Sequence, residues 1–166
     1  MLKVMNHHCS IRLLKCNKMK IGLFPGSFDP FTIGHYSIVK RAIPLFDKII
    51  IAIGINQDKK CLFTTEERVK KIKEIYSKEN KISVSTYKGL TIDFAKKENA
   101  KYIIKGVRSI KDFEYERNQA EINKQIGNVE TIFLITEPQL ACISSSMVRE
   151  LISFGYNVDK FLPKKI

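Results

Sequence analysis

The segment from Pro25 to His35, PGSFDPFTIGH, combines side chains and backbone freedom that suit a phosphate-binding site. Gly26 lets another group approach the backbone closely, and Ser27 offers a hydroxyl. Gly34 and His35 begin a predicted helix, whose first N–H groups attract anions. The His35 imidazole can also donate a hydrogen bond to a phosphoryl oxygen. The segment therefore predicts a phosphate site; the alternative is a plain strand-to-helix turn that a buried histidine caps.

A second candidate anion site lies nearer the carboxyl end of the chain. Residues 143–149 read ISSSMVR and follow the last predicted strand. Three hydroxyls together with the free N–H groups of a helix start form a cradle for an anion. Capping the helix needs only one serine, so three in succession exceed that structural need.

Two cations flank a glycine in the tetrad Lys105-Gly106-Val107-Arg108, which is predicted to follow a strand directly. Cations at the carboxyl end of a strand form a natural phosphate clamp, and a guanidinium suits bidentate contacts. Taken alone, the tetrad fits two solvated surface cations equally well. It continues as SIKDFEYE over residues 109–116.

Short β-rich runs alternate with helical stretches after Met19. The predicted strands cover residues 21–24, 48–53, 82–87, 102–104 and 131–135. The predicted helices are one that Pro44 ends, one capped by Thr64 or Thr65 that extends to Tyr76, and three over residues 90–97, 111–126 and about 144–153. This alternation implies right-handed crossovers. We predict a single α/β domain, a Rossmann-like, doubly wound, parallel five-stranded sheet with flanking helices, whose ligands bind at the carboxyl ends of the strands.

The composition fits a folded domain and permits acidic partners. Of the 166 residues, 44% are hydrophobic and 28% charged, and the formal net charge is +12. No apolar run approaches the ~20 residues that cross a bilayer, so no membrane association is predicted. The four cysteines form no Cys-x-x-Cys pair. His7, His8, Cys9 and Cys16 can be imagined as metal ligands, but no further ligand signal accompanies them and no metal site is predicted.

Residues 1–18 are predicted to be an N-terminal extension. They carry four cations and no acid, which leaves +8 of the net charge for the rest of the chain. A basic leader without acids could be an organellar transit peptide. A start that extends beyond a functional first residue at Met19 is the simpler interpretation.

The motifs resemble those of a known superfamily. PGSFDP and TIGH are similar to the G-[ST]-F-D-P and [TH]-x-G-H pair of the nucleotidylyltransferases, and ISSSMVR resembles their I-S-S-S-x-[VL]-R element. Residues 105–116, KGVRSIKDFEYE, are similar to the R-G-[LV]-R-x-x-x-D-[FY]-E-Y-E signature of phosphopantetheine adenylyltransferases, which usually have arginine where Lys105 stands. Lys59 and the stretch FTTEER over residues 63–68 extend the similarity. The resemblance implies a nucleotidylyltransferase domain over residues 19–166.

This resemblance implies an activity and roles for individual residues. The adenylyl group of ATP would pass to 4′-phosphopantetheine, giving dephospho-CoA and pyrophosphate in coenzyme A biosynthesis. The catalytic residues would be His35, Lys59 and Arg108. The ATP-binding residues would be Ser27, Phe28, His35, Gly106, Val107, Arg108, Glu116, Leu140, Ala141, Cys142, Ile143, Ser144, Ser145 and Ser146. The acceptor would be held by Ser27, Lys59, Thr91 and Lys105.

The resemblance further implies Mg²⁺ that arrives with ATP and a homo-oligomer of six chains. The cysteine usage predicts reduced thiols in a cytoplasmic protein. Two alternatives stay open. A sibling adenylyltransferase would act on nicotinate mononucleotide, although the stretch over residues 105–116 argues against it. A basic nucleic-acid-binding module would explain the net charge, but no helix-turn-helix or RNA-binding signature is present, and no nucleic-acid partner is predicted.

Overall fold

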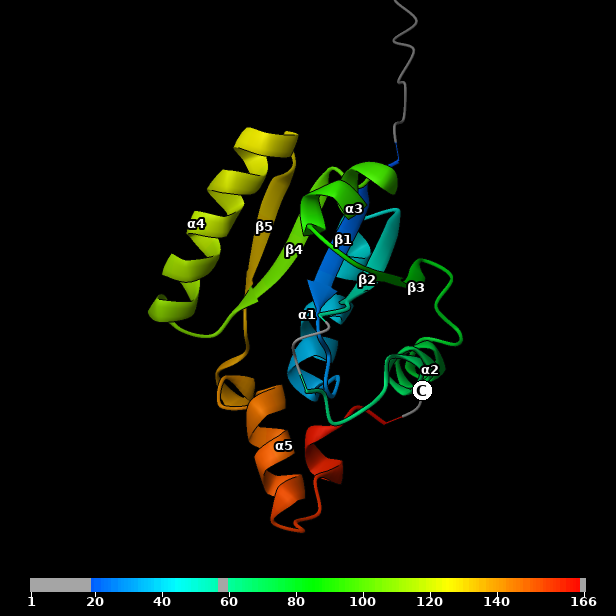
Figure 1. Ribbon diagram of the computed structural model, residues 1–166, viewed down its shortest axis with the longest axis vertical. Helices are drawn as coiled ribbons and strands as arrows, with labels where there is room; N and C mark the ends of the chain where they lie inside the picture. Colours follow the sequence, from blue (N-terminus) through cyan, green and yellow to red (C-terminus); the bar gives the residue numbers. More distant parts are fainter. Residues whose placement is uncertain (1–18, 57–59, 165–166) are drawn as a thin grey trace, which may run out of the picture.

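The computed structural model describes residues 19–56 and 60–164, so the predicted extension over residues 1–18 lies outside the described residues. The described chain forms one parallel sheet with helices around it (Figure 1). The strands are β1 Ile21–Gly26, β2 Lys48–Gly54, β3 Ile82–Tyr87, β4 Tyr102–Val107 and β5 Glu130–Ile135. The α-helices are α1 Ile33–Ala42, α2 Thr65–Ile75, α3 Thr91–Lys97, α4 Ile110–Gly127 and α5 Ser145–Ser153. The predicted α/β class and five-stranded sheet are confirmed.

The strand order is β3-β2-β1-β4-β5, with every pair parallel. The order reverses between β1 and β4, which is the usual position of the ligand site in doubly wound sheets. β1 pairs with β2 along its whole length, but it pairs with β4 only at Gly22 and Leu23. The two central strands therefore part toward their carboxyl ends.

Helices cover both faces of this sheet. On one face, α1 and α2 bury Ile38, Val39 and Ile72 against apolar side chains of β1 and β2. On the other face, α3 buries Ile92 and Ala95. Successive side chains of β2 enter the two clusters alternately, because neighbouring residues of a strand point to opposite faces. The nearly continuous apolar run of β2 is thus explained by burial on both faces.

Side-chain caps begin α2 and α5 where the sequence predicts them. The Thr64 hydroxyl accepts the N–H of Glu67 at 3.2 Å, and the Glu67 carboxylate accepts the N–H of Thr64 at 2.8 Å, which is a capping box. The Ser144 hydroxyl caps α5 by accepting the N–H of Met147 at 3.1 Å. At the other end of a helix, α1 stops at Ala42 and Pro44 lies in the following 3₁₀ turn.

β1 and β4 run further than predicted by more than one residue. β1 includes Pro25 and Gly26, and β4 continues through Lys105 to Val107. Proline has no N–H for a ladder bond, and β1 accommodates it where the strand has a neighbour on the β2 side only. The cation tetrad, predicted to follow a strand, therefore begins within β4, and only Arg108 lies beyond the strand's end.

α4 stands at the side of the molecule, along β4 and β5 (Figure 1). None of its 18 residues is fully buried. Its Ile122 and Ile126 side chains are 47% and 58% exposed. α5 lies beyond the carboxyl ends of the strands (Figure 1). Within the described ranges, no helix combines the length and the apolar character that crossing a bilayer requires.

Candidate active site

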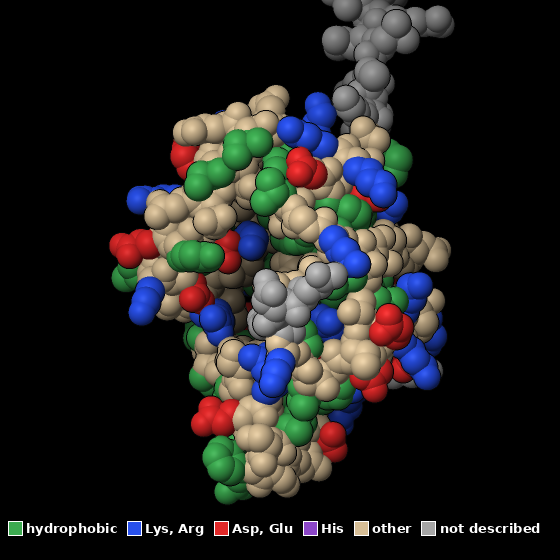
Figure 2. Space-filling view, viewed as in Figure 1, with side chains coloured by type: hydrophobic (Ala, Val, Ile, Leu, Met, Phe, Trp, Pro, Cys, Tyr) green, Lys and Arg blue, Asp and Glu red, His purple; other side chains and the backbone are tan. Residues whose placement is uncertain are grey.

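A hollow of about 370 Å³ opens at the carboxyl ends of β1 and β4. Figure 2 shows this face of the molecule hollowed, with Lys and Arg side chains around it. All three predicted motifs contribute to the lining, and the volume is within the range of small-molecule sites. The predicted site residues that line the hollow are Ser27, Phe28, His35, Lys105, Gly106, Arg108, Glu116, Ile143, Ser144, Ser145 and Ser146.

His35 is both a helix cap and a side chain of the hollow. Its Nδ1 accepts the backbone N–H of the N-cap residue Thr32 at 3.0 Å, and the Thr32 hydroxyl accepts the N–H of His35 at 3.4 Å. This is a capping box in which histidine replaces the usual Glu or Gln. Because Nδ1 accepts, the neutral ring carries its hydrogen on Nε2. The histidine does cap the helix, and the cap does not use the Nε2–H of the ring, which also lines the hollow.

Three aromatic rings surround the imidazole of His35. Its centroid lies 6.3, 5.2 and 5.4 Å from those of Phe24, Phe28 and Phe31. Burial lowers the pKa of His35 to about 4, and the positive charge of Arg108 adds to this effect. The ring is therefore neutral at pH 7, so it is available as a hydrogen-bond donor and not as a cation.

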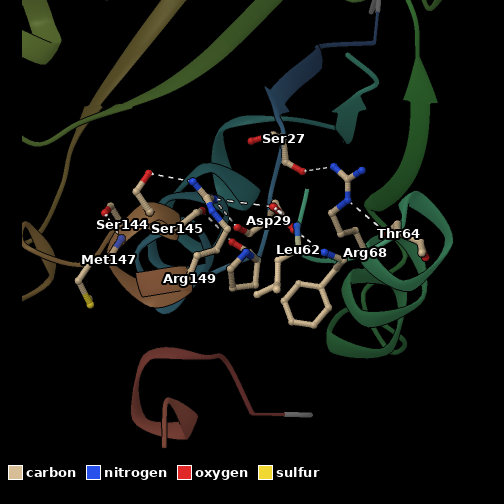
Figure 3. Close-up of polar contacts among 12 residues, drawn as sticks. Ser27, Asp29, Leu62, Thr64, Arg68, Ser144, Ser145, Met147 and Arg149 are labelled. Carbon is tan, nitrogen blue, oxygen red and sulfur yellow. Dashed lines mark hydrogen bonds and ion pairs between the residues drawn. The ribbon is translucent and has the colours of Figure 1, made fainter. Parts of the chain in front are cut away.

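Residues of other segments hold the loop between β1 and α1 in place through contacts with Asp29 (Figure 3). The buried Asp29 carboxylate accepts the N–H groups of Leu62 and Phe63 at 2.8 and 2.9 Å. Arg149 of α5 lies 3.8 Å from the same carboxylate and donates to the Asp29 carbonyl at 2.6 Å. The segment before α2 and the helix α5 thus both fix this one residue of the loop.

Arg68 of α2 holds the start of the same loop (Figure 3). It is buried, and its Nη1 donates to the Ser27 carbonyl at 2.6 Å, while its Nε donates to the Thr64 carbonyl at 3.2 Å. Next in the chain, Phe28 adopts a left-handed backbone with a φ of 48°, which costs a residue other than glycine about 1–3 kcal/mol. A Cβ at Gly26 would lie 2.7 Å from the Phe28 ring, so glycine is required there to admit the ring.

Each of the three serines at the start of α5 has a structural partner. Ser144 caps the helix, Ser145 donates to the Pro30 carbonyl at 2.8 Å, and Ser146 accepts from Nη2 of Arg149 at 3.1 Å. The hydroxyls beyond the one needed for capping therefore tie α5 to the loop and orient Arg149. All three serines also line the hollow, at the positively polarised end of α5.

Both cations of the tetrad are paired with carboxylates of α4. Nζ of Lys105 lies 3.0 Å from Oε2 of Glu116, and Nε of Arg108 donates to Asp112 at 2.9 Å. All four side chains line the hollow and are partly exposed. Ion pairs of this kind are weak, so a phosphate that enters the hollow can compete for the cations.

A second hollow of about 290 Å³ adjoins the first. Ser27 and Lys105 line both hollows and therefore stand at their junction. Thr91, at the start of α3, also lines the second hollow, and its hydroxyl shares a hydrogen bond of 2.8 Å with the Tyr87 hydroxyl. Three of the four residues predicted to hold the acceptor thus converge, and the fourth, Lys59, lies outside the described residues.

Four residues predicted for the nucleotide site do not line the larger hollow. Val107 has a buried side chain, and its carbonyl accepts the N–H of Thr136 at 2.8 Å. Leu140, Ala141 and Cys142 belong to the turn that precedes α5. The structure adds residues to the lining for which the sequence indicated no role in the site: Asp112, Tyr115 and Thr136.

Asp29 and Arg68 are the supporting residues that the sequence analysis did not single out. Asp29 lies in an otherwise apolar stretch, FDPF, where an unpaired charge would be costly. This context could have indicated that Asp29 is buried and has partners in the fold. Arg68 offered no comparable signal, because an arginine on an amphipathic helix usually lies in solvent.

Residues 23–151 match the model of the cytidylyltransferase-like family. The chain is 50% identical to the phosphopantetheine adenylyltransferase of Phocaeicola vulgatus over 146 residues, which are 88% of this chain and 97% of that relative. It is also 50% identical to the phosphopantetheine adenylyltransferase of Porphyromonas gingivalis over 147 residues, 89% of this chain and 96% of that relative.

Solved structures share the fold. The putative nicotinate-nucleotide adenylyltransferase from Vibrio parahaemolyticus superposes with a TM-score of 0.66 at 16% identity, covering 89% of this chain and 95% of that one. A bifunctional NMN adenylyltransferase/ADP ribose pyrophosphatase from Francisella tularensis superposes with a TM-score of 0.70 at 16% identity. The match covers 87% of this chain and 45% of that one. At this identity the likeness concerns the fold alone.

The lowered pKa of His35 predicts how this ring titrates. In the folded protein, the ring should stay neutral from pH 8 down to about pH 5, whereas in the unfolded chain it binds a proton near pH 6.5. The His35 contribution to stability should therefore fall as the pH drops from 6.5 toward 4, by up to about 3 kcal/mol. NMR of the imidazole Cε1–H, assigned by its loss in His35→Gln, measures the titration. An inflection above about pH 6 would contradict the assignment.

Replacing Asp29 with asparagine should destabilise the fold. The amide keeps one acceptor oxygen but turns an N–H donor toward the second backbone N–H, which then stays buried without a partner. We expect Asp29→Asn to lower the free energy of unfolding by about 2–4 kcal/mol. Urea denaturation measures the change. Asp47→Asn is the matched control, because Asp47 is exposed and accepts the N–H of Lys20 at a single oxygen among the described residues, and it should cost less than about 1 kcal/mol. Equal effects of both substitutions would refute the role of Asp29.

Proposed function

We propose that this chain, which belongs to the phosphopantetheine adenylyltransferases of the cytidylyltransferase-like family, transfers the adenylyl group of ATP to 4′-phosphopantetheine and releases pyrophosphate. The observation that carries the proposal is the junction of the two hollows, which Ser27 and Lys105 share. A nucleotide in the larger hollow and a phosphorylated acceptor in the smaller one would bring their phosphates together there. The product belongs to coenzyme A biosynthesis, and family membership is also the ground on which we propose a cytoplasmic location.

The reaction requires the acceptor phosphate to attack the α-phosphorus of ATP in line, with pyrophosphate as the leaving group. In the proposed mechanism, Nε2–H of His35 donates to a phosphoryl oxygen of the triphosphate as negative charge develops. The cap on Nδ1 already aligns this neutral donor, so the ring needs no reorganisation during the reaction. Arg108 would neutralise charge on the nucleotide, and Lys105, with Lys59, would hold the acceptor phosphate.

Mg²⁺ is proposed to accompany the nucleotide. Across residues 19–56 and 60–164, no three His, Cys, Asp or Glu side chains gather as a metal site. The α4 carboxylates of the hollow, Asp112 and Glu116, are engaged by Arg108 and Lys105. This set of donors fits an ion that phosphate oxygens and water hold, as is usual for Mg²⁺ with nucleotides. Bound in that way, Mg²⁺ would neutralise part of the triphosphate charge.

Pyrophosphate release from ATP with different acceptors tests the proposed activity. Relatives named for phosphopantetheine are 50% identical, whereas the structural neighbour named for a nicotinate nucleotide is 16% identical. We expect turnover with 4′-phosphopantetheine and only background release with nicotinate mononucleotide. The opposite preference would overturn the proposed acceptor. Salt-dependent binding of mixed DNA or RNA without any ATP turnover would favour the nucleic-acid-binding alternative.

Substitution of His35 by glutamine should separate its two roles. Glutamine is a standard partner in a capping box, so His35→Gln keeps an acceptor for the Thr32 N–H while it removes the ring donor of the hollow. We expect kcat to fall about 100- to 1,000-fold, because one donor to developing charge is lost, while the melting temperature and the affinity for ATP change little. Single-turnover and equilibrium-binding measurements provide these values. Near-normal turnover in the variant would exclude His35 from catalysis.

We further propose that the chain forms a homo-oligomer through α4, a hexamer as the family resemblance implies. Large apolar side chains exposed on one helix are typical of an interface. Those on α4 are Ile110, Phe113, Tyr115, Ile122 and Ile126, which are 41–79% exposed. Light scattering should give six times the 19.1 kDa mass of the chain, and Ile122→Glu should lower that mass. The mass of a single chain for the unsubstituted protein would contradict the proposal.

A further inference from the structure

The Lys105–Glu116 ion pair connects the two hollows. The ammonium and the carboxylate are 3.0 Å apart, and the side chains are 26% and 21% exposed. Lys105 lines both hollows, whereas Glu116 lines only the larger one. The pair therefore joins a cation at the junction to a carboxylate on the nucleotide side. A group that changes the charge or the partners of Glu116 acts directly on Lys105.

Glu116 keeps hydrogen-bonding capacity that its neighbour Asp112 has used. Both oxygens of Asp112 accept from the Arg108 guanidinium, at 2.9 and 3.5 Å. Oε2 of Glu116 is enclosed and accepts no hydrogen bond within the described part of the chain, so its contact with Lys105 is an ion pair without hydrogen-bond geometry. An ionised carboxylate can accept about four hydrogen bonds. Oε2 itself is enclosed, but the Glu116 side chain is 21% exposed and lines the larger hollow, so the carboxylate can take donors from a ligand there.

We propose that Glu116 is a positioning residue that couples nucleotide binding to acceptor binding through Lys105; this inference rests on the proposed function. In the free protein, the Glu116 carboxylate competes with the acceptor phosphate for the Lys105 ammonium. Hydroxyl or amino donors of a bound nucleotide engage the carboxylate and weaken its hold on Lys105. The released ammonium then binds the acceptor phosphate. By linkage, each substrate raises the affinity of the other by the same factor.

Lysine suits this exchange better than the arginine that related enzymes usually have. A guanidinium forms a rigid fork and binds a carboxylate through two parallel bonds. The ammonium of Lys105 is a point charge with rotatable donors on a flexible stem, so it can turn from Glu116 to a phosphate at the junction without a change in the backbone.

Calorimetric titration of the full chain with 4′-phosphopantetheine, alone and with saturating α,β-methylene-ATP, tests the coupling. For the unsubstituted protein, we expect the nucleotide analogue to lower the acceptor Kd about fivefold or more. In Glu116→Gln, the acceptor should bind the free protein about fivefold more tightly than it binds the unsubstituted protein. The analogue should then improve the Kd of this variant by less than about twofold. Unchanged melting temperatures verify that the variant is folded.

Two further variants separate the coupling from a general effect of charge. In Lys105→Gln, acceptor binding should be weak with or without the analogue, and adding Glu116→Gln should change it no further, because Glu116 acts through Lys105. Glu130→Gln breaks the Lys124–Glu130 pair at the far end of α4, and it should keep the full coupling.

Coupling that persists in Glu116→Gln, or that is missing from the unsubstituted protein, would overturn the inference. These results are distinct from failure of the proposed function. If pyrophosphate release with 4′-phosphopantetheine is normal and the analogue does not change the acceptor Kd, the coupling alone is wrong. If no pyrophosphate is released with this acceptor, the proposed function is wrong, and the inference is overturned with it.

Discussion

β1 and β4 are neighbours at the centre of the sheet, yet they pair only through Gly22 and Leu23. On either side, the β1–β2 and β4–β5 pairs continue to the strand ends. The opening between the central strands is thus a property of the whole sheet and does not depend on a single loop. It places the loop that follows β1 opposite the cations at the end of β4, and α5 and α4 complete the walls. The residues that line the hollow from β1, β4 and their loops take their positions from this separation.

Between the strands, the loop after β1 is kept in one conformation by partners distant in sequence. Arg68, Asp29 and Arg149 connect it to α2, to the segment before α2 and to α5. A buried carboxylate is tolerated only when its oxygens are satisfied, so Asp29 requires those partners. The loop in turn sets the position of the Thr32 cap, and the cap selects the tautomer of His35. The contacts of Asp29 and the cap at Thr32 therefore belong to one short loop, and together they position the ring of His35.

The electrostatics of the hollow are more balanced than the net charge of the chain suggests. Lys105 and Arg108 are paired with the carboxylates of Glu116 and Asp112, and Arg149 lies near the carboxylate of Asp29. His35 is neutral because it is enclosed. A polyanionic ligand would exchange partners with ion pairs already formed and would not enter a field of free positive charge. Selectivity would then come from the placement of donors, since weak, partly exposed pairs can be exchanged at low cost.

Interactions between residues close in the chain account for what the sequence by itself determined. Alternating apolar runs, the Thr64 and Ser144 caps and Pro44 specified the elements within a few residues, because each depends on neighbours in the chain. The motifs over residues 25–35, 105–116 and 143–149 indicated most residues of the hollow. They could do so because the carboxyl ends of parallel strands meet at one edge of the sheet. Tertiary structure alone decided the extension of β1 through Pro25, the pairing of Lys105 with Glu116 and the burial of Asp29. These features depend on which strands separate and on partners up to 120 residues away, and no local pattern records such distances.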